Sequence, residues 1–206
     1  MRAPAERDRL FNAIEHIPCV ARKAAWAQRW IASSASFATR LIAFAVVEGI
    51  FFSGSFCAIF WIKKRGLLPG LCVSNTLIAR DERMHQEFAT FLYREMIAEK
   101  LPEAVVHEIV GDAVRHEIEF VCEAIPVSLI GMNADDMSEY IRFVADRLLT
   151  ELGVRKLFDA TNPFDWAVML GLENKTNFFE QRVSEYRKAG VSASSGSHTF
   201  SQAVDF

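Results

Sequence analysis

The stretch IAFAVVEGIFFSGSFCAIFWI, residues Ile42 to Ile62, decides the fold, and Glu48 is its only charged residue. As a helix it is long enough to cross the ~30 Å hydrocarbon core of a membrane, and Lys63-Lys64-Arg65 follow it as a basic flank would. A carboxylate is costly inside a membrane, however, and the later helical segments are amphipathic. We therefore interpret the stretch as the apolar central helix of a soluble bundle, with a membrane span as the alternative.

The overall composition is that of one globular domain. Of the 206 residues, 51% are hydrophobic and 24% are charged, which is enough for one sizeable core. The net charge is -3 and no long run of like charges occurs, so nothing in the charge pattern favours binding to nucleic acid or to a membrane surface. We expect partners that are proteins or small molecules.

Cysteine usage and the start of the sequence indicate a cytoplasmic protein. The 4 cysteines are scattered, without a Cys-x-x-Cys pair, and the first residues lack the apolar segment of a secretory signal. Reduced thiols are expected.

Apolar residues recur at three- and four-residue spacing, which predicts an all-α protein. From Tyr186 onward the sequence is rich in Ser, Ala and Gly, which predicts a flexible tail over residues 188–206 after a helical domain over 1–187. The predicted helices cover 21–32, 36–64, 73–98, 102–125, 135–152, 163–169 and 173–187.

The segment IARDERMHQEF contains Glu82 and His85 at a spacing that places both side chains on one face of a helix. A carboxylate with an imidazole suits Fe, Mn or Zn, although such a pair also arises by chance on helix surfaces. A buried Glu48 must be protonated, paired or bound to metal. A lone Glu on one helix and Glu-x-x-His on another make half of the ligand pattern of di-iron carboxylate proteins.

Several motifs carry a family resemblance over nearly the whole chain. They include VEGIFFSGSFCAIFWIKKRGLLPGL, SNTLIARDERMH, YIRFVADRLLTELG, KTNFFEQRVSEY and the ending FSQAVDF. Together they resemble the small, radical-generating subunit of class I ribonucleotide reductase of the eukaryotic type. The resemblance implies a ferritin-like helical bundle and a homodimer. It also implies two irons, with manganese as the alternative, that oxidise a buried tyrosine with O2 in ribonucleoside-diphosphate reductase.

The resemblance assigns roles to individual residues. It makes Glu48, Glu82 and His85 the ligands of one half of the metal site. It makes Asp81 a carboxylate that hydrogen-bonds a ligating histidine and carries the radical toward the surface, and Tyr186 a tyrosine that passes it to the large subunit.

Two further groups of residues also gain roles from the resemblance. Phe52, Phe56 and Ile78 resemble the apolar pocket around the radical, although core residues at helical spacing would look the same. Phe200, Asp205 and Phe206 match a C-terminal peptide that docks into the large subunit.

The chain departs from the family pattern at its start, because the family's first Glu-x-x-His, its Asp ligand and its radical tyrosine precede the part that matches. With three ligands of six, we expect at most one weakly held metal. We expect the sequence to be a C-terminal portion that lacks the family's N-terminal helices and is inactive alone. The alternative is a short non-catalytic paralogue that binds and regulates the large subunit.

Overall fold

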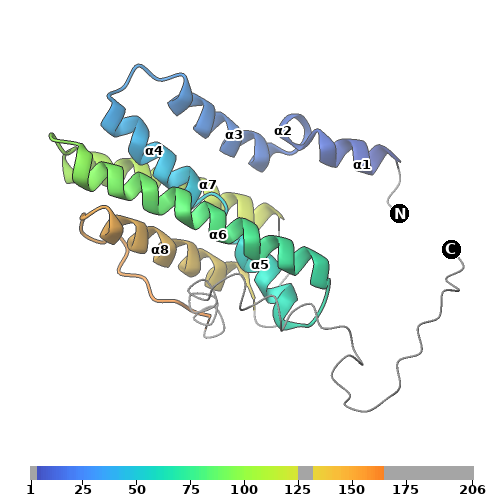
Figure 1. The fold of residues 1–206 in the computed structure, drawn as a ribbon. Coiled ribbons are helices and arrows are strands. Elements are labelled where there is room, and N and C mark those ends of the chain that lie inside the picture. The colour runs from blue at the N-terminus through green and yellow to red at the C-terminus, as the bar shows by residue number, and fades with distance from the viewer. Residues whose placement is uncertain (1–3, 125–131, 165–206) are drawn as a thin grey trace, which may run out of the picture. The chain divides into compact units, whose positions relative to one another are not determined.

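The computed structural model describes residues 4–124 and 132–164 (Figure 1). These residues form helices and no β-strand, which confirms the all-α prediction. In sequence order the elements are α1 (Pro4–Phe11), α2 (Ala13–His16), α3 (Pro18–Ile31), α4 (Phe37–Gly49), α5 (Ser53–Lys64), α6 (Pro69–Phe91), the π-helical turn η1 (Leu92–Met96), α7 (Glu103–Ala124) and α8 (Ala134–Glu151).

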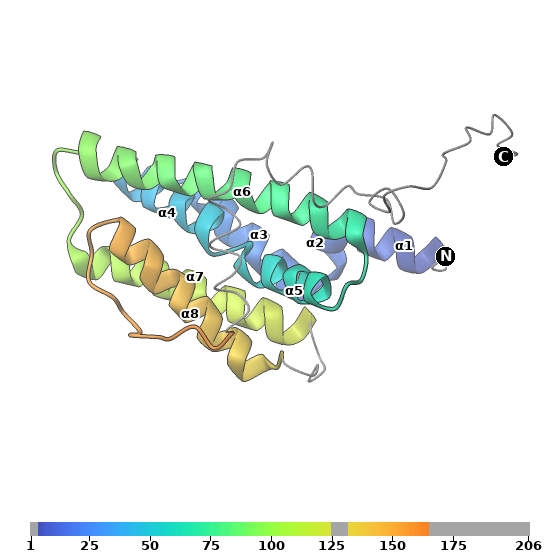
Figure 2. The ribbon, with the colours of Figure 1, turned by 60° about the horizontal axis from the view of Figure 1, so that its bottom comes forward.

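Helix α4 lies at the centre of the bundle. It contacts α3, α6, α7 and α8, and its residues Ile42, Ala45 and Val46 are fully buried. Figures 1 and 2 show α4 and α6 side by side and antiparallel, with the antiparallel pair α7 and α8 packed against them. This packing favours the interpretation of α4 as a core helix.

One stretch of the described residues, Phe37–Lys64, has the length and composition of a membrane span, with a mean hydropathy of 2.0. Half of its apolar window is buried inside the protein. It is also not one helix. The predicted helix over 36–64 is wrong in this respect, because the helix breaks at 50–52 between α4 and α5.

Two side chains that are distant in sequence, Lys23 and Glu117, stabilise the break at 50–52. Lys23 Nζ donates a hydrogen bond of 2.6 Å to the carbonyl oxygen of Phe51, and Glu117 Oε1 accepts one of 3.2 Å from the Gly54 N–H. A Cβ on Gly54 would lie 2.8 Å from Glu117 Oε1, so the close approach of this turn to α7 requires glycine. Backbone groups that a continuous helix would use internally are bonded from outside instead.

The other predicted helices agree with the structure to within a few residues. Those over 21–32, 102–125 and 135–152 correspond to α3, α7 and α8, and the one over 73–98 corresponds to α6 and η1. Helix α6 begins at Pro69. Proline is well tolerated at the first position of a helix, because the N–H that it lacks would have no partner within the helix.

Helices α1 and α2 were not predicted, because neither buries a residue and so neither carries an apolar stripe. Of the predicted helix over 163–169, residues 163–164 are not helical and the rest lies outside the described residues. The predicted helix over 173–187 and the tail over 188–206 also lie outside them.

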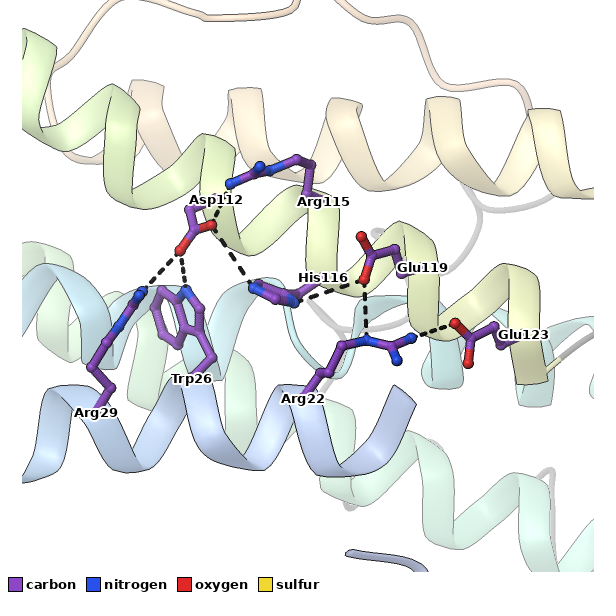
Figure 3. Close-up of polar contacts among 8 residues, drawn as sticks. All are labelled: Arg22, Trp26, Arg29, Asp112, Arg115, His116, Glu119 and Glu123. Atoms are coloured by element: carbon purple, nitrogen blue, oxygen red, sulfur yellow. Dashed lines mark hydrogen bonds and ion pairs between the residues drawn. The ribbon is translucent and has the colours of Figure 1, made fainter. Parts of the chain in front are cut away.

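Polar contacts fasten α3 to α7 (Figure 3). Asp112 accepts hydrogen bonds of 2.8 Å from Trp26 Nε1 and from Arg29, and further along the helices Arg22 lies 3.3 Å from Glu119. Burial raises the pKa of Asp112, but the donors Arg29 and Trp26 outweigh burial, so its pKa lies below the ordinary value. Asp112 is therefore a charged anchor between the two helices.

Candidate metal centre

The three predicted ligands meet between α4 and α6. Glu48 lies in the last turn of α4, and Glu82 and His85 lie on one face of α6, which runs antiparallel beside it. His85 Nδ1 is 3.0 Å from Glu82 Oε2 and 3.4 Å from Glu48 Oε2. One potential ligand atom from each residue lies within 4.8 Å of the other two. Glu48 and Glu82, which are 34 positions apart in sequence, thus place their carboxylates close together.

The pKa values of Glu48, Glu82 and His85 depend on one another, because the three side chains are hydrogen-bonded or lie close together. Burial and the neighbouring Glu82 together raise the pKa of Glu48 to about 7, against the lowering effect of His85. The hydrogen bond with Glu48 lowers the pKa of Glu82, and the hydrogen bond with Glu82 raises the pKa of His85. Two carboxylates this close are stable only with a proton or a cation between them. A bound metal ion would displace that proton.

The donor set fits a transition metal. Two carboxylates and one imidazole are hard and intermediate ligands of the kind that iron and manganese accept. Three donors leave several coordination positions open on one ion, whereas a dinuclear centre of the carboxylate type needs two Glu-x-x-His pairs and two lone carboxylates. The described residues supply half of that set.

The cluster opens toward solvent. The side chains of Glu48, Glu82 and His85 are 14%, 21% and 49% exposed, so accessibility increases from α4 to the outer side of α6. Metal ions could therefore reach the ligands without unfolding of the bundle.

The residues of the predicted radical pocket lie close to the ligands in sequence. Phe52 and Phe56 follow Glu48 across the break, and their rings contact each other at a tilt of 42° with centroids 6.1 Å apart. Ile78 lies one turn before Glu82 on α6 and is 50% exposed, and Phe52 is 38% exposed. Two of the three side chains are therefore exposed among the described residues, and their role as a shield stays a prediction.

Of the remaining predicted residues, only Asp81 lies in the described part of the sequence. Asp81 is exposed on α6 and, within the described part of the sequence, makes no hydrogen bond with His85. Tyr186 lies outside the described residues, and so do the three docking residues Phe200, Asp205 and Phe206.

Sequence reasoning missed two residues that pack closely between α4 and α6 beside Glu48, namely Gly49 and Gln86. A Cβ on Gly49, next to Glu48, would lie 2.6 Å from Gln86 Oε1, and Gln86 Nε2 donates a hydrogen bond of 2.5 Å to Glu151 of α8. Glu151 also lies 3.8 Å from Arg83. The only signal in the sequence was a glycine directly after the lone carboxylate of an apolar helix.

Comparisons with known proteins agree on one family. A family model described as ribonucleotide reductase, small chain, matches residues 1–163. The protein is 58% identical over 205 aligned positions to the ribonucleoside-diphosphate reductase small chain of Nicotiana tabacum, with 98% of this sequence and 62% of that protein covered. It is 57% identical to the small chain of Trypanosoma brucei brucei, with 98% and 60% covered. It thus spans about three fifths of the length of these relatives.

Solved structures give the same result at the level of the fold. The ribonucleotide reductase Rnr4 homodimer of Saccharomyces cerevisiae has a TM-score of 0.69 and 36% identity, with 87% of this sequence and 54% of that one covered. A putative class I ribonucleotide reductase from Bacillus halodurans has a TM-score of 0.73 at 19% identity, with 82% and 66% covered, and shows likeness of fold alone. These neighbours confirm the prediction of a ferritin-like helical bundle.

Proposed function

Because the chain belongs to the ribonucleotide reductase small-chain family, we propose that it functions as a small subunit of ribonucleoside-diphosphate reductase. In this role it holds iron, or manganese, and supplies the oxidising equivalent with which a large subunit converts ribonucleotides to deoxyribonucleotides. The observation that carries the proposal is the meeting of Glu48, Glu82 and His85 between two antiparallel helices.

Different residues would bind the metal and surround it with apolar side chains. The metal, when bound, supplies the redox chemistry. Glu48 and Glu82 would hold it through carboxylate oxygens and His85 through Nδ1, the nitrogen that faces both carboxylates. Phe52 and Phe56, which follow Glu48 in sequence, would form part of an apolar surround for the oxidised group.

The proposal extends to transfer and assembly. Asp81 and Tyr186 carry the oxidising equivalent away from the metal, and the C-terminal peptide with Phe200, Asp205 and Phe206 binds the large subunit. The protein acts in the cytoplasm as a homodimer. Its identity to reductase small chains over 98% of its length supports these roles.

A second candidate function is a non-catalytic protein that binds and regulates the large subunit. The observation that favours it is the ligand count, because the described residues hold three of the six ligands of a dinuclear carboxylate centre. Such a regulator would depend on the C-terminal peptide and would not need metal.

One experiment with two readouts tests the proposal. We expect the purified 206-residue protein to retain Fe(II) under anaerobic conditions and to capture the large subunit from solution. Glu82→Gln should abolish iron retention without affecting capture, and deletion of 200–206 should abolish capture without affecting iron. Capture without iron retention would favour the regulator, and a protein that does neither would contradict both functions.

A further inference from the structure

We propose that Lys23 and Glu117 are positioning residues for the candidate ligand Glu48, and that they hold the wide turn at residues 46–51 in which it lies. The inference rests on the metal-binding part of the proposed function. It goes beyond that function by assigning a role to two residues that are not among the ligands.

Glu48 lies inside a wide turn of the α4 backbone. The N–H of Phe51 donates a hydrogen bond of 3.4 Å to the carbonyl oxygen of Val46, which is five residues earlier instead of the usual four. The same oxygen accepts a bond of 2.8 Å from the N–H of Ile50. One extra residue is thus accommodated at the end of α4, as in a π-bulge, and such bulges are frequent at functional sites.

The wide turn and the break that follows it are held by contacts with α3 and α7. Residues 50–52 are Ile, Phe and Phe, so no proline or glycine among them interrupts the helix. Lys23 of α3 bonds the carbonyl oxygen of Phe51. Glu117 of α7 bonds the N–H of Gly54, three residues later. In a regular helix, both backbone groups would find their partners within the helix.

The two side chains form a firm support because they are buried and paired with each other. The side chain of Glu117 is fully buried and that of Lys23 is 14% exposed. Lys23 Nζ lies 5.2 Å from the ring centroid of Phe51, and Trp26 meets the same ring at 67° with centroids 4.9 Å apart. Replacement of a buried ion pair by apolar side chains of similar size is often neutral or stabilising. The pair is therefore better explained by the turn that it holds than by stability alone.

Without the pair, residues 46–54 can close into a regular helix. Removal of the extra residue from the turn changes the direction of the side chains around it by about 100°, the rotation per residue of an α-helix. Glu48 would then lose its distance of 3.4 Å from His85 Nδ1. Glu82 and His85 lie on α6, whereas the pair bonds the backbone after α4, so only one of the three ligands would move.

The double variant Lys23→Met with Glu117→Leu separates positioning from stability. Both replacements are apolar and similar in size to the original residues, so the variant should be at least as stable as the unmodified protein. Its Mn(II) affinity should fall about ten-fold, as for other residues that orient a metal ligand. The six-line electron paramagnetic resonance signal of free Mn(II) measures the affinity of the full 206-residue protein, and urea unfolding without metal measures its stability.

Two single variants are the matched controls. Asp146→Ala removes a buried carboxylate that bonds the segment after α8, so it should lower the unfolding free energy and keep the Mn(II) affinity of the unmodified protein. Glu117→Gln keeps an oxygen that can accept the Gly54 N–H, and it should also bind Mn(II) like the unmodified protein. Hydrogen exchange of the amides at 49–54 should change in the double variant and in neither control.

Two results would overturn the positioning role alone. A stable double variant that binds Mn(II) as tightly as the unmodified protein would refute it and leave the metal site of the proposed function intact. Equal weakening in Asp146→Ala would attribute the loss of affinity to general destabilisation. If the double variant does not fold, Lys23→Met alone gives the same comparison, because a proton can neutralise Glu117. An unmodified protein that binds no Mn(II) would contradict the proposed function together with this inference.

Discussion

Lys23 and Glu117 form a buried ion pair at the break between α4 and α5, with 2.5 Å between Nζ and Oε2. Glu117 is fully buried, and Lys23 also lies 3.9 Å from the ring centroid of Phe120. The same two side chains bond the backbone at Phe51 and Gly54. The pair therefore joins three helices around the turn that follows Glu48.

The pH dependence of stability should report on Glu117. Burial raises its pKa to about 7 against the opposing effect of Lys23, so the folded protein holds a proton that the unfolded state releases near pH 4.5. The contribution of the protonated Glu117 carboxyl to the unfolding free energy is fully present below the unfolded pKa and is lost as pH rises through about 7. Relative to Glu117→Gln, the unmodified protein should lose about 3 kcal/mol of unfolding free energy between pH 4.5 and 7.5. Urea unfolding across this range measures the difference, and parallel curves would contradict the assignment.

Gly54→Ala should destabilise the protein. The new Cβ would lie 2.4 Å from Val121 Cγ2 and 2.8 Å from Glu117 Oε1, so α5 and α7 would have to separate. We expect a loss of about 2 kcal/mol in unfolding free energy, as for other overpacked sites. Gly70→Ala in the first turn of α6 is the control, because its Cβ would meet nothing within 4 Å, and it should be neutral or stabilising. Equal losses in both variants would point to a general effect of replacing glycine.

Asp146 holds the segment after α8 to the bundle. Its buried carboxylate accepts backbone hydrogen bonds from Leu157, Phe158 and Ala160, at distances of 2.9 to 3.0 Å. Asp146→Ala leaves three donors without a partner and should cost about 3 kcal/mol of unfolding free energy. Asp135→Ala, at an exposed position of the same helix, should cost less than about 1 kcal/mol. Thermal unfolding of the two variants side by side gives the comparison.

Metal should stabilise the protein through the three ligands. A ligand that binds only the folded state adds about 2.7 kcal/mol at a concentration one hundred times its dissociation constant. Mn(II) should therefore raise the unfolding temperature of the unmodified protein, and a chelator should reverse the increase. Glu82→Gln should abolish the effect, whereas Glu87→Gln, which removes an exposed carboxylate of the same helix, should retain it. An increase that survives Glu82→Gln would show that the ion binds elsewhere.

The helices and the metal cluster were predictable because their signals are local. The spacing of Glu82 and His85 follows from helix periodicity, and the apolar stretch around Glu48 indicates a central helix. The resemblance to a family then linked the two segments, and the structure brings the three side chains together.

The break between α4 and α5 was not predictable from local sequence. The groups that stabilise it, on Lys23 and Glu117, are 28 and 63 residues away from their backbone partners. Local composition at 50–52 is that of a helix interior. Only the tertiary structure shows which side chains bond its backbone groups.

The glycine after Glu48 has a consequence for the geometry of the cluster. Glu48 belongs to α4 and its two companions to α6, so the gap between the helices sets the separation of the ligand atoms. Gly49 leaves room in that gap for Gln86, because a methyl group there would lie 2.6 Å from Gln86 Oε1 and the Gln86 side chain would have to shift. The separation of the ligand atoms therefore depends on how closely the two helices pack, and Gly49, a residue that binds nothing, contributes to that packing.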